Sequence, residues 1–249
     1  MTFALTFTQN EKCKAPSTKL KVQQRTTDNG LLTTLATMYP SGNLFIPVEH
    51  GRLEAILKEP PEGLGHGVAL VLHPHPLGGG TMHNKVVFRA AAALNDAGLT
   101  TLRLNFRGVG QSTGVHDNGR GELEDVRAGI AYLAEKYPAQ SITVCGFSFG
   151  AWVGLQIGVP DERVKNLISI GTPVDKYDFT FVETCRKAIL FVHGELDEFG
   201  DVQRLRALVD KLKKHTSVQL TVIPGAGHFF EGHLDELKHA ITDWVTTNE

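Results

Sequence analysis

Residues 141–158 read SITVCGFSFGAWVGLQIG, and this stretch decides the fold. The apolar run at 141–146 predicts a strand, and the spacing of apolar residues over 151–158 predicts a helix. Between them lies a G-x-S-x-G motif centred on Ser148, in which a sharp strand-to-helix turn presents a serine hydroxyl at the edge of a sheet. The motif alone also fits an ordinary turn with a capping serine. The strand before it and the helix after it favour a nucleophile.

Outward from this stretch, strands and helices alternate along the chain. Residues 43–48 and 52–58 flank His50-Gly51 as a hairpin would. Further strands are predicted at 67–73, 100–106, 164–171, 187–194 and 217–225, and helices at 85–98, 121–137, 202–215 and 233–245. Several strands are apolar on both faces, which indicates an α/β fold with a largely parallel sheet and helices on each side. Functional groups in such sheets lie in the loops after the carboxyl ends of the strands.

The composition is that of a globular protein. The chain has 249 residues, of which 41% are hydrophobic and 21% charged, and this length suits one domain. Residues 1–38 are rich in Thr, Gln and Lys without a clear period. We therefore expect an N-terminal tail or loosely docked arm over 1–38 and the α/β domain over 39–249.

Charge and cysteine content exclude several classes of partner and compartment. The formal charge of −2, from 25 basic and 27 acidic residues, gives no electrostatic case for nucleic acid or an anionic membrane surface. Three cysteines are too few and of the wrong parity for a disulfide scaffold. No apolar run approaches the roughly 18 residues of a membrane span, and the N-terminus does not resemble a secretory signal. The default expectation is the cytoplasm.

Two later loops supply the residues that a serine nucleophile needs. FVHGELDEFG (191–200) follows an apolar strand and contains Asp197, and LTVIPGAGHFF (220–230) ends the last strand and contains His228. His228 would accept the Ser148 proton, and Asp197 would orient its imidazole. Four other carboxylates compete for the second role: Glu195, Glu198, Asp175 and Asp178. Asp197 is favoured by its place in the Gly-Glu-Leu-Asp turn.

Acyl transfer also needs donors aimed at the oxygen that becomes negative. One expected donor is the backbone N–H of Phe149, the residue after the nucleophile. The second should come from the loop HPHPLGGG (73–80), where Pro74 and Pro76 have no N–H. That leaves His75 or Leu77, and His75 is slightly favoured because it lies two residues past the end of the strand.

Two stretches imitate other kinds of site. His73 and His75 form an H-x-H pair, but no further ligand cluster follows, so no metal is expected. The segment GVGQST (108–113) imitates a dinucleotide fingerprint, but Thr113 replaces its third glycine, so no cofactor is expected. Arg107, just before that segment, is interpreted as a structural residue that ties loops together beneath the site.

These motifs together resemble the short, capless bacterial α/β hydrolases related to dienelactone hydrolase and to esterase- and peptidase-like families. The matching stretches are VLHPHPLGGGTMHNKVV, LRLNFRGVGQSTG, VCGFSFGAWVG, LFVHGELDEF and IPGAGHFF, which lie in order between residues 71 and 230. The order Ser…Asp…His is also that of this superfamily. The resemblance implies an eight-stranded, mostly parallel sheet and carboxylic-ester hydrolysis, without naming a substrate.

The absence of a long insertion shapes the expected substrate. Residues 172–187, TPVDKYDFTFVETCRK, leave room for a loop and a short helix but not for a cap domain. We therefore expect a shallow pocket with aromatic walls, for which the candidates are Phe147, Phe179, Phe181, Phe229 and Phe230, with Val182 and Trp152 as further candidates that can equally be core residues.

The sequence supports two hypotheses about function. One is a serine hydrolase acting through an acyl-enzyme on a small carboxylic ester, with a thioester, lactone or amide as alternatives. The other is a non-catalytic binding or scaffold protein of the same fold, since fold alone does not decide function. An intact Ser148, Asp197 and His228 favours the enzyme. The oligomeric state is left open.

Overall fold

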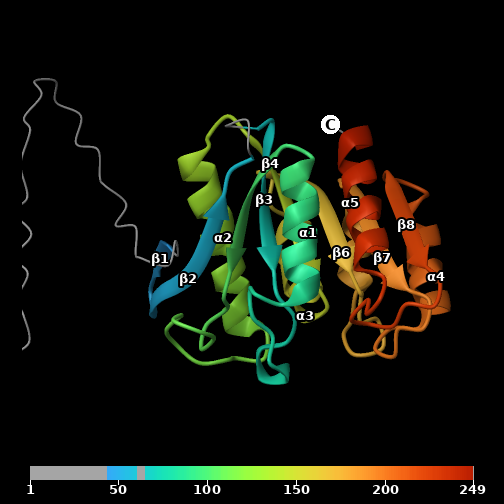
Figure 1. Cartoon of the computed structure of the whole chain (residues 1–249), viewed down its shortest axis with the longest axis horizontal. Coiled ribbons are helices and arrows are strands. Elements are labelled where there is room, and N and C mark those ends of the chain that lie inside the picture. The colour runs from blue at the N-terminus through green and yellow to red at the C-terminus, as the bar shows by residue number, and fades with distance from the viewer. Residues whose placement is uncertain (1–43, 61–64, 249) are drawn as a thin grey trace, which may run out of the picture. The chain divides into compact units, whose positions relative to one another are not determined.

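The structure, a computed structural model, describes residues 44–60 and 65–248. The predicted arm over 1–38 lies outside these residues. Eight strands form one sheet in the order β1-β2-β4-β3-β5-β6-β7-β8 (Figure 1). Strands β1, β2 and β4 pair antiparallel, and every other neighbouring pair is parallel. The strands are β1 (Leu44–Val48), β2 (Gly51–Lys58), β3 (Gly67–Leu72), β4 (Leu99–Leu104), β5 (Ser141–Phe147), β6 (Val164–Ile170), β7 (Ala188–Gly194) and β8 (Val218–Ile223).

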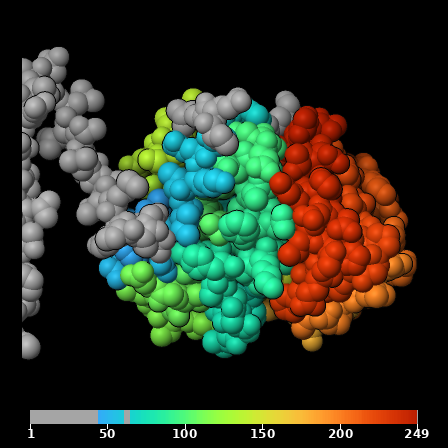
Figure 2. Space-filling view, in the orientation of Figure 1, coloured from blue at the N-terminus to red at the C-terminus, as the bar shows by residue number. Residues whose placement is uncertain are grey.

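Five α-helices cover both faces of the sheet within the described residues. Helices α1 (Lys85–Asp96) and α5 (Leu234–Asn248) lie against one face, and α2 (Arg120–Lys136), α3 (Phe149–Gly158) and α4 (Val202–Leu212) pack on the other. Figure 2 shows α1 and α5 side by side on the face toward the viewer. This arrangement confirms the predicted α/β-hydrolase architecture of a mostly parallel sheet with helices on both faces.

The hydrophobic pattern explains the two-sided core. All six residues of β3 are buried, because the strand has helices on both of its faces. Alternate residues of β3 point to opposite sides: Leu70 and Leu72 join the core under α2 and α3, whereas Ala69 and Val71 join the core under α1 and α5. Helices therefore pack on both faces of the sheet, and this packing fixes the position of the carboxyl ends of its strands, which form the carboxyl edge of the sheet.

The loops that follow the parallel strands meet at that edge, which is the lower one in Figure 1. The loop after β3 contains a short 3-10 helix, η1 (Pro76–Gly78). Between β6 and β7, a stretch that is described throughout, the chain forms the 3-10 helix η2 (Thr180–Thr184) and no cap domain, as predicted. No helix in the described ranges has the length and apolar character needed to cross a membrane.

Candidate active site

The turn between β5 and α3 holds Ser148 in an uncommon backbone conformation. Its φ is +55° and its ψ −117°, a region that residues with a side chain rarely adopt. The two glycines of the motif allow the turn: a Cβ on Gly146 would lie 2.3 Å from the Gly150 carbonyl oxygen, and a Cβ on Gly150 would lie 2.5 Å from that of His73. This close packing presents the Ser148 side chain at the carboxyl edge of the sheet.

Three side chains from three loops form a continuous hydrogen-bond chain. The Nδ1–H of His228 donates to the Asp197 carboxylate, with distances of 2.8 Å to Oδ2 and 3.0 Å to Oδ1. This bond leaves Nε2 as the acceptor of the Ser148 hydroxyl, at 2.8 Å. Asp197 is 8% exposed and His228 3% exposed, so both are shielded from water. The structure therefore brings together the three residues that the sequence singled out.

The loop after β7 aims one carboxylate at His228 and uses the others elsewhere. Asp197 follows a tight turn at Gly194, where a Cβ would lie 2.4 Å from the Ala226 carbonyl oxygen. Its Oδ1 also accepts the backbone N–H of Phe199 at 2.9 Å. The competing carboxylates have other partners: Glu195 accepts from Gly225 N–H, Glu198 from His228 N–H, Asp175 pairs with Arg204, and Asp178 accepts from Thr180.

The loop after β3 separates the two candidate oxyanion donors. The backbone N–H of Leu77 donates to the His75 Nδ1 at 3.2 Å and so begins η1. The backbone N–H groups of His75 and Phe149 have no hydrogen-bond partner among the described residues. Of the two candidates in this loop, His75 therefore keeps a free donor and Leu77 does not.

His73 is fixed by the backbone on both of its ring nitrogens. Its Nε2 accepts the Phe106 N–H at 3.0 Å, so the proton is on Nδ1, which donates to the Pro74 carbonyl at 2.7 Å. Burial lowers the pKa of His73 to about 4, which keeps the ring neutral. With both nitrogens engaged, the ring has no lone pair to offer a metal ion. In the described part of the chain, no group of three or more His, Cys, Asp or Glu side chains is arranged so that it could hold a metal ion.

A cavity of about 430 Å³ opens beside Ser148 and His228. Most of its wall comes from the loops after β3 and β6 and from the loops that carry Asp197 and His228. The lining residues are Pro74, His75, Gly78, Gly79, Gly80, Asn84, Ser148, Pro173, Lys176, Tyr177, Phe199, His228 and Phe229.

The structure corrects four of the five aromatic candidates for this cavity. Phe229 lines it, but Phe147 is buried behind His228, with the two ring centroids 5.0 Å apart. Phe230 is 0% exposed and packs in the core under α1 and α5. Phe179 and Phe181 stack on each other and join the core on the side of α2, α3 and α4, and neither is among the residues that line the cavity.

The cavity has aromatic walls that the sequence analysis missed. Tyr177 lies two residues before Phe179 in the same loop, and its ring stacks on Trp152 with centroids 4.3 Å apart. Phe199 packs against His228 at 4.6 Å. For Phe199, the one sequence signal that could have placed it in the cavity wall was its position two residues after Asp197. Nothing in the sequence separated Tyr177 from its neighbours Phe179 and Phe181.

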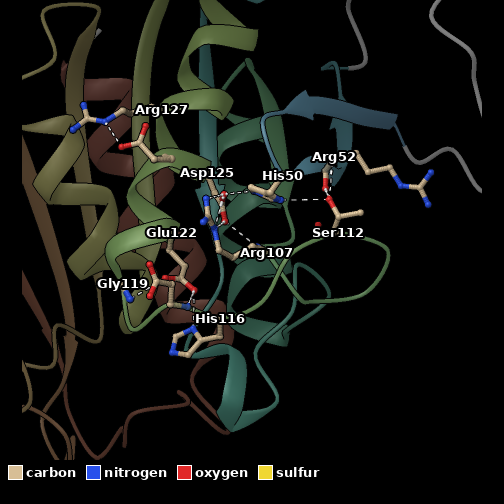
Figure 3. A network of polar contacts seen from close by, with 12 residues as sticks. His50, Arg52, Arg107, Ser112, His116, Gly119, Glu122, Asp125 and Arg127 are labelled. Atoms are coloured by element: carbon tan, nitrogen blue, oxygen red, sulfur yellow. Dashed lines mark hydrogen bonds and ion pairs between the residues drawn. The ribbon is translucent and has the colours of Figure 1, made fainter.

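Two carboxylates of α2 tie the surrounding loops together, as Figure 3 shows. Asp125 accepts the backbone N–H of Arg107 at 2.8 Å and its Nη2–H at 2.7 Å, and this confirms the structural interpretation of Arg107. Glu122 lies 2.7 Å from Nδ1 of His116, whose ring packs on both His75 and Phe149 at 4.9 and 5.7 Å. His116 could not be singled out from the sequence, because its partners come from distant elements.

Comparison with known proteins agrees with this geometry. Residues 69–186 match the α/β-hydrolase fold family. An uncharacterised protein of Rickettsia prowazekii is 41% identical over 187 residues, covering 72% of this chain and 79% of its own. The chain belongs to the α/β-hydrolase fold family.

Two solved structures extend the comparison. An α/β serine hydrolase homologue from Coxiella burnetii is 37% identical, with a TM-score of 0.75, and the match covers 81% of this chain and 95% of that one. A Xanthomonas campestris member of the α/β serine hydrolases, described as lacking a lid, is 33% identical, with a TM-score of 0.75 and coverage of 84% and 96%. These relatives support hydrolase activity and the capless form of the fold.

Proposed function

We propose that this protein is a serine hydrolase that cleaves small carboxylic esters through an acyl-enzyme on Ser148. The observation that carries the proposal is the pair of bonds on His228. Its Nε2 lies 2.8 Å from the Ser148 Oγ, and its Nδ1 is held by Asp197. A serine hydroxyl is a weak nucleophile until a base takes its proton, and this geometry provides the base in the required tautomer.

The first half of the reaction forms the acyl-enzyme. Ser148 Oγ attacks the ester carbonyl carbon while its proton passes to Nε2 of His228. The Asp197 carboxylate stabilises the resulting imidazolium. The tetrahedral intermediate then expels the alcohol, which takes the proton from Nε2, and the acyl group stays on Ser148.

The second half repeats these steps with water. His228 accepts a proton from water as the water oxygen attacks the acyl carbon, and then returns that proton to the Ser148 oxygen as the carboxylic acid leaves. In both halves the negative oxygen would accept hydrogen bonds from the backbone N–H groups of Phe149 and His75, since neither has another partner in the described structure.

Thioesters, lactones and amides can react by the same mechanism. The competing hypothesis is a binding protein that has the fold but catalyses no reaction. The intact hydrogen-bond chain and the cavity that reaches Ser148 support the enzyme. The φ of +55° at Ser148, a conformation that costs about 1–3 kcal/mol and is common at active sites, supports the enzyme as well.

A fluorophosphonate probe tests the proposal directly, because it reacts with activated serines and not with ordinary ones. We expect the probe to label the full-length protein at Ser148, located by mass spectrometry, and a panel of 4-nitrophenyl esters to be hydrolysed. The Ser148→Ala variant should lose both properties. An unlabelled wild-type protein, or label on another serine, would contradict the proposal.

A further inference from the structure

The wall of the cavity carries one permanently charged side chain among its described lining residues, that of Lys176. The rest of the wall is aromatic, proline, glycine, asparagine and the proposed catalytic residues. No carboxylate is among the described residues that line the cavity, although the Asp197 carboxylate lies directly behind His228. The formal charge on the described wall is therefore that of Lys176, while the chain as a whole has a net charge of −2.

Lys176 has no ion-pair partner among the described residues, although two exposed basic residues of α4, Arg204 and Lys211, have one. Three carboxylates of its own loop and of the loop after β7 have other partners: Asp175 pairs with Arg204, Asp178 accepts from Thr180, and Glu198 accepts from the backbone N–H of His228. Lys176 is exposed, so its ammonium group is hydrated and can meet a ligand at the rim of the cavity.

The side chain of Lys176 is held on the same side as the proposed base. Its Nζ lies 5.5 Å from the ring centroid of Phe199, within reach of a cation–π interaction. The Phe199 ring in turn packs against the His228 ring, with centroids 4.6 Å apart. The Phe199 ring therefore contacts both the Lys176 ammonium group and the His228 imidazole.

The backbone around Lys176 is fixed as well. The N–H groups of Lys176 and Tyr177 both donate to the Pro173 carbonyl, at 3.0 and 3.2 Å, which closes a tight turn. Tyr177 is anchored by its stack on Trp152, at an interplanar angle of 11°. The turn therefore presents Lys176 to the cavity from a rigid base.

An exposed cation at the rim of a largely apolar wall favours a ligand that carries the opposite charge. The described lining of this cavity offers a single ammonium and no guanidinium, which matches one negative charge, as on a carboxylate. A phosphate dianion would call for a second cation or a bidentate donor.

We propose that Lys176 forms an anion subsite of this cavity and that the natural substrate is a small ester carrying a carboxylate group. The inference deepens the proposed hydrolase function, and the ester bond of the substrate rests on that function. Binding of an anion by Lys176 does not depend on hydrolysis, so it can be tested with or without turnover.

The kinetic test uses two pairs of esters, each pair differing only in a carboxylate and its neutral amide. One pair places the group on the acyl side: mono-4-nitrophenyl adipate and its terminal amide. The other places it on the leaving group: the butyrate esters of 3-hydroxybenzoate and 3-hydroxybenzamide. The measured quantity is the ratio of kcat/KM within a pair, corrected for spontaneous hydrolysis.

In at least one pair, we expect the wild type to prefer the carboxylate, and the preference should fall on the order of fivefold in Lys176→Met. Lys176→Arg should retain it. Ionic strength of about 1 M should weaken it, because the screening length shrinks to about 3 Å. Lys165→Met is the matched control: it removes the same charge from an exposed site near the start of β6, at the opposite edge of the sheet, and should leave the ratio unchanged.

A binding measurement separates this inference from the hydrolase proposal. In a Ser148→Ala background, NMR titration gives the Kd of each ester without turnover, and Lys176→Met should erase the difference within the pair. The subsite would be overturned if Lys176→Met changed neither the kcat/KM ratio nor the difference in Kd between the carboxylate and the amide, in both pairs of esters. Loss of fluorophosphonate labelling together with intact carboxylate binding would instead overturn the hydrolase and leave the subsite standing.

Discussion

Asp197 shows how closely the site depends on single residues. It lies in a loop with two other carboxylates, Glu195 and Glu198, and the three are equivalent in charge. The turn at Gly194 directs Asp197 alone to Nδ1 of His228, while Glu198 reaches only the backbone N–H of the same histidine. The proposed catalytic role of Asp197 therefore depends on the orientation of its side chain, and mutation can test it.

Asp197→Asn should lower kcat by about 10⁴-fold, because an amide favours the wrong imidazole tautomer and cannot stabilise the imidazolium. Glu198→Gln should cost far less, since its amide oxygen can still accept the backbone bond. Steady-state kinetics on 4-nitrophenyl acetate compares the two variants. Equal damage from both would mean that the acid has been assigned to the wrong residue.

His73 should make the folded state sensitive to acid. Burial lowers its pKa to about 4, whereas the unfolded chain should titrate near 6.5, so the unfolded state binds more protons between these values. The contribution of neutral His73 to the free energy of unfolding should thus be fully present above about pH 6.5. The free energy of unfolding should fall by up to about 3 kcal/mol as the pH drops to about 4.

Urea unfolding across this pH range gives the slope. His73→Asn should flatten it, and His215→Asn, which removes an exposed histidine, should not. A slope that is the same in all three proteins would show that other groups govern the acid response.

At the scale of the elements, the turn from β5 into α3 depends on how closely its backbone approaches the loop after β3. A Cβ at Gly150 would lie 2.5 Å from the His73 carbonyl oxygen and 2.7 Å from that of Leu72. These are backbone atoms in a fully buried region, so they have little room to move.

Gly150→Ala should therefore destabilise the protein by about 1–3 kcal/mol, even though alanine is the better helix former. Gly78→Ala is the matched control, because the nearest atom to its added Cβ is 3.9 Å away. Thermal unfolding followed by circular dichroism compares them. A Gly150→Ala protein as stable as the wild type would show that the two loops can separate.

The short connection between β6 and β7 limits the substrate. Without a cap, a long acyl chain would extend past the cavity of about 430 Å³ into water. Each additional methylene is worth about 0.8 kcal/mol only while it is buried.

We expect 4-nitrophenyl acetate to butyrate to be hydrolysed with a higher kcat/KM than the decanoate and palmitate. A specificity constant that keeps rising with chain length would require a further apolar groove, and the capless, small-substrate interpretation would fail.

The order of elements and the proposed catalytic residues could be predicted from the sequence, because both depend on local patterns. Apolar runs gave the strands, and parallel strands bring their following loops to one edge, so Ser148, Asp197 and His228 could be placed together before any distance was known. The cavity wall could not be predicted in the same way. Whether Tyr177 or Phe179 faces Ser148 depends on how a loop packs against Trp152, and the choice between His75 and Leu77 depended on a single 3-10 turn.

For the molecule as a whole, the proposed chemistry requires no group other than protein side chains and water. The H-x-H pair that most resembles a metal site has His73 bound to the backbone through both nitrogens. Dialysis against EDTA should therefore leave ester hydrolysis unchanged at neutral pH. A loss of activity that added zinc restores would mean that the loop after β3 rearranges to bind metal.

The conformation of Ser148 has a consequence for how this protein can evolve. Glycine is the residue best suited to a φ of +55° and a ψ of −117°, so Ser148→Gly would relieve strain of about 1–3 kcal/mol. Part of that gain, about 0.4–1 kcal/mol, would be offset by the greater freedom of glycine in the unfolded chain. A laboratory selection for heat resistance alone would therefore favour Ser148→Gly, and serine would be kept only under simultaneous selection for the proposed hydrolase activity.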